Sequence, residues 1–241
     1  DSIIEQADAI MVARGDLGVE CPFEHLPILQ REIVRSCQII GKPVIVATHM
    51  LEIMCQEPVP TRAEVTDVAN AVFEQADAIM LSGETSVGKF PNRCVQAMDR
   101  IARRMEREPA ARFHELASLT NDRQKLAKAA VNMADDLDAQ AIVVFTRVGR
   151  LVPEVAWMRP CRAPILALCL NDEVARSLAL HRGVRPVVLP WDDAEASDVV
   201  DHALKNLVEQ NLLEQGDTVV IVSSRRAVEE IDDSVQMARV S

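Results

Sequence analysis

Residues 5–16 read EQADAIMVARGD and residues 74–85 read EQADAIMLSGET, so the same seven residues open both stretches. Each stretch starts with the polar end of a helix, continues into an apolar run typical of a buried strand, and ends in polar residues. Residues 43–49, PVIVATH, follow the same plan between them. Seven consecutive identities at a helix-to-strand junction favour successive β/α units of a barrel over a coincidence of common residues.

Helical patterns separate these strands. Apolar residues recur at helix spacing over residues 25–40, and Gly41 ends the pattern. Thr61 and Glu64 form a capping-box pattern for a helix over residues 61–74, and Pro91 opens a helix to about residue 108. We also expect a short helix at residues 50–54 and a loop at residues 82–85.

Three strands cannot close an eight-stranded barrel. We therefore expect residues 1–110 to form a partial (β/α)8 catalytic domain of about three β/α units. Residue 1 is Asp, and residues 2–6 resemble the last turns of a helix, so we expect the chain to begin inside a fold.

The spacing of predicted helices and strands changes after a polar connector at residues 111–121. Residues 122–241 alternate helical and strand patterns and predict a three-layer α/β domain with a mostly parallel sheet. The expected helices are 122–136, 151–158, 172–181 and 195–213. The expected strands are 141–146, 164–168, 186–189 and 218–223, with an edge strand at 235–240.

Composition excludes several function classes. The 241 residues include 26 Lys plus Arg and 37 Asp plus Glu, which gives a net charge of −11 without a basic half. Aromatic residues make up 3% and Tyr is absent, so nucleic acid is a poor candidate partner. No apolar run approaches the roughly 20 residues of a membrane span. The six cysteines form no CxxC pattern, which favours a reduced, cytoplasmic protein.

The residues after the first strand are the strongest candidate site. Because the carboxyl ends of barrel strands carry the chemistry, Asp16 is placed to hold a hard cation such as Mg²⁺. Backbone amides at Gly15 and Asp16 could bind a small carboxylate or phosphate if they begin a helical turn. A tight turn capped by Asp16 is an equally good interpretation.

Polar residues also follow the other two strands. Thr48 could contact a substrate oxygen, although a helix cap is the simpler role for it. His49 could be a general acid or base, but a structural histidine is more common. Ser82 and Glu84 could organise water. Each motif is weak alone, and their shared position after successive strands is what favours a common site.

At these residues the sequence resembles pyruvate kinase. The matching strings arrive in the family's order: MVARGDLGVE (11–20), GKPVIVAT (41–48), PTRAE (60–64), DVANAV (67–72) and IMLSGET (79–85). The second half resembles the family's C-terminal domain more loosely, around residues 163–165 and 181–184. The resemblance implies phosphoryl transfer from phosphoenolpyruvate to ADP, giving pyruvate and ATP in glycolysis, with Mg²⁺ and K⁺.

The resemblance also implies roles for individual residues. Asp16 is similar to a Mg²⁺ ligand that also contacts substrate, and Arg14, Gly15 and Asp16 stand in the substrate-binding segment. Thr48 is similar to the family's substrate contact beside the enolate carbon, and Ser82 and Glu84 to members of the water network that protonates it. The full enzyme is expected to be a homotetramer.

Other parts of the family's site have no counterpart in this sequence. The lysine that stabilises the phosphoryl group, a second Mg²⁺ ligand and the K⁺ ligands belong to the family's preceding segment. We therefore expect the chain alone to lack useful kinase activity. The alternative is a non-catalytic regulatory or oligomerisation module derived from the family. A mutase or lyase that uses phosphoenolpyruvate fits the strings less well.

Three departures from the family pattern stand out. His49 stands where the family usually has Gln, which changes the hydrogen bonding expected next to Thr48. The other two concern regulation. The loop that grips an effector phosphate in allosteric members reads Thr146-Arg147-Val148-Gly149-Arg150-Leu151, in which Val148 and Leu151 replace hydroxyl donors. The family's Gly-rich effector loop is not recognisable in residues 223–230. We expect weak or absent activation by sugar bisphosphates, with Thr146, Arg147, Gly149 and Arg150 as a weak anion site.

Overall fold

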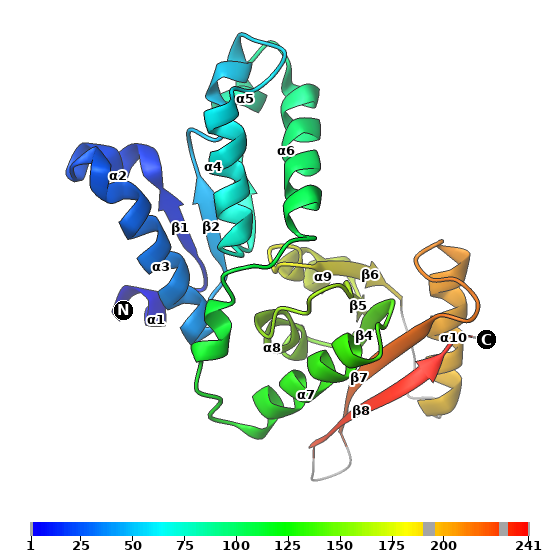
Figure 1. Cartoon of the computed structure of the whole chain (residues 1–241). Helices are drawn as coiled ribbons and strands as arrows, with labels where there is room; N and C mark the ends of the chain where they lie inside the picture. Colours follow the sequence, from blue (N-terminus) through cyan, green and yellow to red (C-terminus); the bar gives the residue numbers. More distant parts are fainter. Residues whose placement is uncertain (1, 190–195, 227–230, 241) are drawn as a thin grey trace. The chain divides into compact units, whose positions relative to one another are not determined.

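The strands β1 (Ile10–Ala13), β2 (Val44–Ala47) and β3 (Ala78–Met80) form a parallel sheet in the order β1-β2-β3 (Figure 1). The computed structural model describes residues 2–189, 196–226 and 231–240. Within those residues β1 and β3 pair only with β2, so both are sheet edges. This agrees with the predicted partial barrel, because three adjacent strands cannot close on themselves.

Helices α3 (Leu26–Ile40) and α4 (Arg62–Phe73) connect these strands, and α6 (Pro91–Met105) follows β3 and packs against α4. Gly41 ends α3 in the left-handed conformation, with φ 87°. The predicted capping box of α4 is confirmed: the Glu64 amide donates to the Thr61 hydroxyl oxygen, and the Thr61 amide donates to the Glu64 carboxylate. The shorter elements are α1 (Ser2–Gln6), α2 (Arg14–Glu20), η1 (Phe23–His25) and η3 (Phe113–Leu116).

Two local predictions differ from the structure. Residues 82–85 were expected as a loop, but α5 (Gly83–Ser86) forms there because the Ser82 carbonyl accepts the amides of Thr85 and Ser86. The short helix expected at residues 50–54 is a 3-10 turn, η2 (Glu52–Cys55). Met50 and Leu51 are fully buried, so packing rather than helix pattern decides the backbone there.

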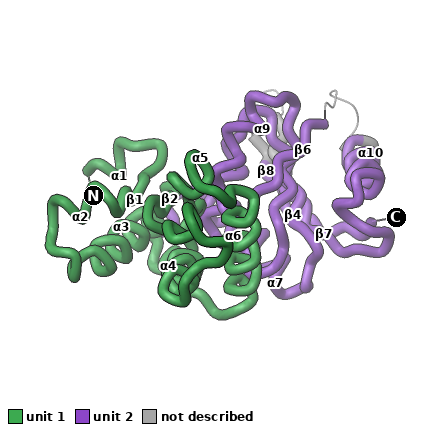
Figure 2. Tube along the Cα trace, turned by 90° about the horizontal axis from the view of Figure 1, so that it is seen from above, with its two compact units in different colours: residues 1–117 green, residues 118–241 purple. Residues whose placement is uncertain are grey.

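The second unit, Ser118–Ser241, follows the first, Asp1–Ala117 (Figure 2). Its five-stranded sheet has the order β6-β5-β4-β7-β8, and only β8 runs antiparallel, against β7. The three-layer fold with a mostly parallel sheet is thereby confirmed. Its strands are β4 (Ala141–Thr146), β5 (Ile165–Cys169), β6 (Val184–Val188), β7 (Thr218–Arg226) and β8 (Ile231–Arg239). Its helices are α7 (Asp122–Asp136), α8 (Leu151–Trp157), α9 (Asp172–Leu178) and α10 (Ala196–Glu209).

Alternating side chains of this sheet build a core on each face. Val143 and Ile221 pack with Leu207 of α10, whereas Ile142 and Val220 are buried on the opposite face. Strands buried on both faces are typical of parallel sheets covered by helices. Residue 195, the expected start of α10, and residues 227–230 of the expected effector loop lie outside the described residues.

Two properties of the whole chain complete the description. No helix in the described part combines the length and apolar composition needed to cross a bilayer. None of the six cysteines forms a disulfide bond.

Candidate functional site

The parallel sheet brings the three predicted segments to one edge. Ala13 pairs with Ala47, and Ala47 pairs with Met80, so the carboxyl ends of the three strands lie side by side. The residues that follow them, Arg14 to Asp16, Thr48 and His49, and Ser82 to Glu84, therefore share that edge. Sequence reasoning predicted this convergence from the position of each motif after its strand.

A direct hydrogen bond joins the first two segments. The Gly15 amide donates to the Thr48 hydroxyl oxygen over 2.8 Å, and that hydroxyl donates to the Ala47 carbonyl over 2.7 Å. A side chain at residue 15 would begin 3.5 Å from the Thr48 hydroxyl oxygen and 3.7 Å from the His49 ring. Residue 15 therefore faces Thr48 and His49, although these contacts alone do not require glycine.

The backbone at Thr48 and His49 is left-handed, with φ values of 67° and 54°. Such a conformation is unusual for a β-branched residue, and each residue held this way costs about 1–3 kcal/mol. Strain of this kind persists only where the surroundings fix it, and it gathers at functional sites.

The Arg14 side chain contacts this strained turn. Its Nε donates to the Thr48 carbonyl over 3.1 Å, and its Nη1 lies 2.6 Å from both carboxylate oxygens of Asp67 in α4. The Arg14 side chain is 10% exposed. Sequence reasoning assigned Asp67 no role, because its partner lies 53 residues away and no local pattern marks the pair.

Asp16 lies exposed in the first turn of α2. The turn begins at Arg14, so the helical start required for amide binding near Gly15 is present. Among the described residues no group of three or more His, Cys, Asp or Glu side chains could hold a metal ion. Asp16 therefore fits Mg²⁺ only as one ligand beside water and substrate oxygens, an arrangement that Mg²⁺ commonly adopts.

Glu84 links the segment after β3 to the segment after β2 through hydrogen bonds. It is 3% exposed, and its carboxylate accepts the Leu51 amide over 3.0 Å and the Ser82 amide over 2.7 Å. Burial alone would raise the pKa of this carboxyl, but the backbone amides of Leu51, Glu84 and Ser82 and the charge of His49 outweigh it, and the pKa lies below its ordinary value. Glu84 is therefore held as a carboxylate.

Ser82 and His49 have different surroundings. The Ser82 hydroxyl oxygen is buried and makes no hydrogen bond to the described part of the chain. The His49 side chain is 60% exposed, and its Nε2 lies 4.0 Å from the Glu52 carboxylate. A buried hydroxyl without a protein partner is suited to binding water.

The expected anion loop of the second unit follows β4. The Thr146 hydroxyl oxygen accepts the Gly149 amide over 2.8 Å, and Thr146 is 5% exposed. Gly149 needs its left-handed φ of 84° to make this turn. Arg147 and Arg150 are exposed. The threonine hydroxyl therefore holds the loop together.

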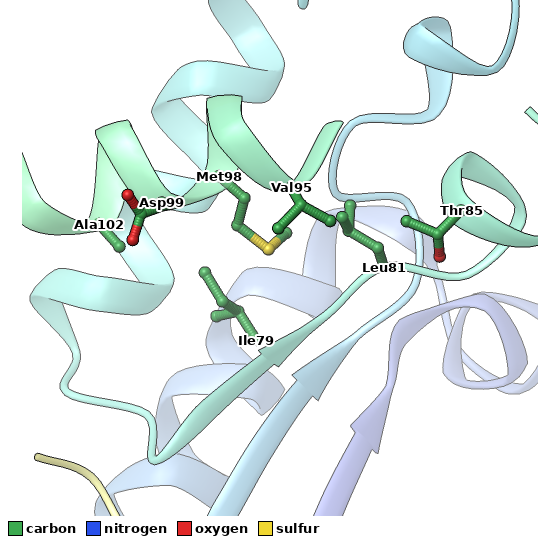
Figure 3. A pocket seen from close by; sticks show the side chains of 7 residues that line it. All are labelled: Ile79, Leu81, Thr85, Val95, Met98, Asp99 and Ala102. Carbon is green, nitrogen blue, oxygen red and sulfur yellow. The ribbon is translucent and has the colours of Figure 1, made fainter. Parts of the chain in front are cut away.

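A hollow of about 420 Å³ opens between β3 and α6. Figure 3 shows Ile79 and Leu81 of the β3 segment facing Val95 and Met98 of α6. The lining is mostly apolar, with Asp99 and Thr85 at its margin. None of the predicted site residues lines this hollow, although Leu81 and Thr85 in its lining are the chain neighbours of Ser82 and Glu84.

Comparison with known proteins matches both units to one family. The profile of the pyruvate kinase barrel domain matches residues 1–95, and that of the pyruvate kinase alpha/beta domain matches residues 124–240. This chain belongs to the pyruvate kinase family.

Individual relatives agree with this assignment. Plastidial pyruvate kinase 3 of Arabidopsis thaliana is 45% identical over 226 residues, covering 92% of this chain and 39% of the relative. A pyruvate kinase of Geobacillus stearothermophilus is 42% identical over 228 residues, covering 92% of this chain and 38% of the relative. The crystal structure of a pyruvate kinase from Cryptosporidium parvum has a TM-score of 0.91 and 36% identity, and covers 100% of this chain and 48% of that one. The chain thus spans less than half the length of these pyruvate kinases.

Proposed function

We propose that this chain carries part of the catalytic centre of a pyruvate kinase, which transfers a phosphoryl group from phosphoenolpyruvate to ADP. The supporting observation is the joining of the first two strand-end segments by the Gly15–Thr48 hydrogen bond. In the reaction the bond between phosphorus and the enolate oxygen breaks and a bond to the terminal ADP oxygen forms. The enolate carbon then takes a proton and becomes pyruvate.

The residue roles proposed here are those that the resemblance to the family implies, and the convergence of the three segments on one edge of the sheet supports them. The amides at Gly15 and Asp16 bind the substrate carboxylate, Asp16 is a ligand of Mg²⁺, and Thr48 lies beside the enolate carbon. When bound, the metal neutralises negative charge that develops on the transferred group. The buried Ser82 hydroxyl and the Glu84 carboxylate position water near the carbon that is protonated.

We propose no useful activity for the chain alone. A phosphoryl-transfer site needs cationic groups around the moving phosphoryl group, and the loss of one such group commonly costs about 10²–10³-fold in rate. Within the described residues the Arg14 side chain is hydrogen-bonded to Asp67 and to the Thr48 carbonyl, and Asp16 belongs to no group of three or more His, Cys, Asp or Glu side chains that could hold a metal ion. The remaining ligands, including those for K⁺, would come from the rest of a pyruvate kinase barrel.

The decisive experiment measures pyruvate formation from phosphoenolpyruvate and ADP with Mg²⁺ and K⁺. The purified chain is expected to show no turnover above the blank. A chimera in which this chain replaces the matching segment of the Geobacillus stearothermophilus relative is expected to be active. A chimera that folds and assembles like the parent enzyme but makes no pyruvate would contradict the proposed function.

A non-catalytic role is the second candidate. The second unit forms a sheet covered on both faces with its own core, so it has the features of a self-contained regulatory or oligomerisation module. An inactive chimera together with stable self-association of the chain would favour this candidate.

We also propose a homotetramer in a reducing, cytoplasmic setting. Val19, Phe23 and Ile28 are 85%, 81% and 57% exposed, which favours a subunit interface on this part of the first unit. Six cysteines without a disulfide bond agree with a reducing compartment. Light scattering of the active chimera tests the tetramer, and a monomeric active enzyme would contradict it.

For the loop after β4 we propose a weak anion site formed by Thr146, Arg147, Gly149 and Arg150. The Thr146 hydroxyl already accepts the Gly149 amide. Titration of the active chimera with a sugar bisphosphate is expected to change its rate little, and strong activation would overturn this proposal.

A further inference from the structure

We propose that Arg14 and Asp67 form a positioning pair that holds the Thr48 hydroxyl at the Gly15 amide. The inference rests on the proposed function, because it concerns the residues assigned to that site. It gives Arg14 a role inside the protein rather than on the substrate, and it adds Asp67, which belongs to α4 and follows none of the strands.

The first step concerns the backbone that needs support. Thr48 and His49 are consecutive left-handed residues without glycine, at the point where β2 ends. The Thr48 carbonyl accepts hydrogen bonds from the Arg14 side chain, and a backbone carbonyl shielded from water requires such a donor. Without such a donor the two residues would return to an ordinary negative φ, and the Thr48 side chain would turn with the backbone.

Arg14 supplies the donors. Its Nε donates to the carbonyls of Thr48 and Ala47 over 3.1 and 3.3 Å, and its Nη2 also donates to the Thr48 carbonyl. A planar guanidinium can direct several N–H groups at fixed angles, which a lysine ammonium cannot do. Arg14 therefore fixes both the position and the direction of the Thr48 carbonyl.

Asp67 fixes the guanidinium itself. Both of its carboxylate oxygens lie 2.6 Å from Arg14 Nη1, and the Arg14 side chain is 10% exposed. Val68 and Ala71, which follow on α4, are fully buried, so the helix that carries Asp67 is firmly packed. A largely buried cation with a carboxylate partner loses its geometry when the partner is neutralised.

A continuous chain of contacts results, from α4 through Asp67 and Arg14 to the Thr48 carbonyl. The Thr48 hydroxyl then accepts the Gly15 amide over 2.8 Å. The distance between the substrate-binding segment after β1 and the threonine after β2 is thereby set by a residue that lies on neither segment.

The first test uses the purified chain and needs no activity. Hydrogen exchange of the Gly15 amide is measured by NMR in Asp67→Asn, in Arg14→Lys and in the matched control Arg103→Lys, whose ion pair with Asp99 is exposed on α6. Exchange at Gly15 is expected to rise about tenfold in the first two variants, the size expected for a lost hydrogen bond, and to stay unchanged in the control. Thr48→Val, which removes the acceptor, gives the upper limit.

The second test uses the active chimera and separates binding from turnover. Asp67→Asn and Arg14→Lys are expected to lower kcat with a smaller change in KM, because the substrate still binds but Thr48 is misplaced. We expect kcat to fall by about 10- to 10²-fold, which is the cost that a small misplacement of a catalytic group can have. Asp67→Glu, which keeps the charge, is expected to recover part of kcat. A purely structural role would lower the melting temperature without this split between kcat and KM.

The outcomes distinguish the two proposals. If Gly15 exchange is unchanged in Asp67→Asn and Arg14→Lys while Thr48→Val accelerates it, the positioning pair is refuted whatever the enzyme does. If exchange rises in both variants but the folded wild-type chimera makes no pyruvate, the pair stands and the proposed function fails.

Discussion

The Gly15 amide and the Thr48 hydroxyl oxygen lie 2.8 Å apart and form a hydrogen bond, although 33 residues separate them along the chain. The bond links the start of α2 to the end of β2. A substrate carboxylate that binds the Gly15 amide must therefore share this donor with Thr48 or displace it. The approach of the ligand and the orientation of the threonine are coupled at this single contact.

Replacement of Thr48 in the active chimera should reveal that coupling. Thr48→Val keeps the shape of the side chain but removes the hydroxyl, and we expect kcat to fall about 10²-fold, within the range for a positioned polar group in a proton-transfer step. Thr48→Ser keeps the hydroxyl and should retain most of the activity. Steady-state kinetics check both variants. Equal kcat values for Thr48→Val and wild type would show that the Thr48 hydroxyl takes no part in catalysis.

Replacement of Glu84 should destabilise the first unit. In Glu84→Gln the side-chain amide must direct an N–H group at one of the two backbone donors, Leu51 or Ser82. We expect the free energy of unfolding to fall by about 1–3 kcal/mol, the usual cost of an unsatisfied buried group. Urea titration measures the change, and the exposed Glu108→Gln serves as control. If the free energy of unfolding falls no more than in the control, the hydrogen bonds of Glu84 to the Leu51 and Ser82 amides contribute little to stability.

The stability of the first unit should fall at acidic pH, in part because Glu84 takes up a proton. The folded state lowers the pKa of Glu84 below its ordinary value of 4.5, so the folded state binds this proton less readily than the unfolded chain does. Its contribution to stability is complete above that ordinary value and is lost as the pH falls through the lower, folded pKa. Melting temperatures between pH 7 and pH 3 should therefore fall less steeply in Glu84→Gln than in wild type. Parallel curves would refute the assignment.

Glu154 in α8 should behave in the opposite way. Burial raises its pKa, and the charge of Arg123 and a hydrogen bond from Gln124 offset this only in part. A raised folded pKa stabilises the protein at low pH, and this stabilisation is lost as the pH rises through the folded value. At pH 7 we expect Glu154→Gln to leave the free energy of unfolding unchanged or to raise it by as much as about 1 kcal/mol. Urea titration measures the change. A clear loss of stability would mean that the charged form is favoured.

Features that depend on near neighbours in the chain were predictable. The capping box of α4 joins Thr61 to Glu64, three residues away, and Gly41 ends α3, because caps and helix ends are local interactions. The strands could be located because a buried parallel strand is a short apolar run. The repeated heptapeptide and the polar residues after each strand also predicted that the three segments converge on one edge.

Features that depend on distant partners were not predictable. The hydrogen bond between the Leu51 amide and the Glu84 carboxylate joins residues 33 positions apart, and no sequence pattern indicated it. Likewise the sequence showed Arg14 only as part of a motif, and its partner Asp67 lies 53 residues away. Periodicity and caps record which residues are neighbours along the chain. The left-handed turn at Thr48 and the ion pair beside it exist only once packing has brought β1, β2 and α4 together, and therefore only the tertiary structure decided them.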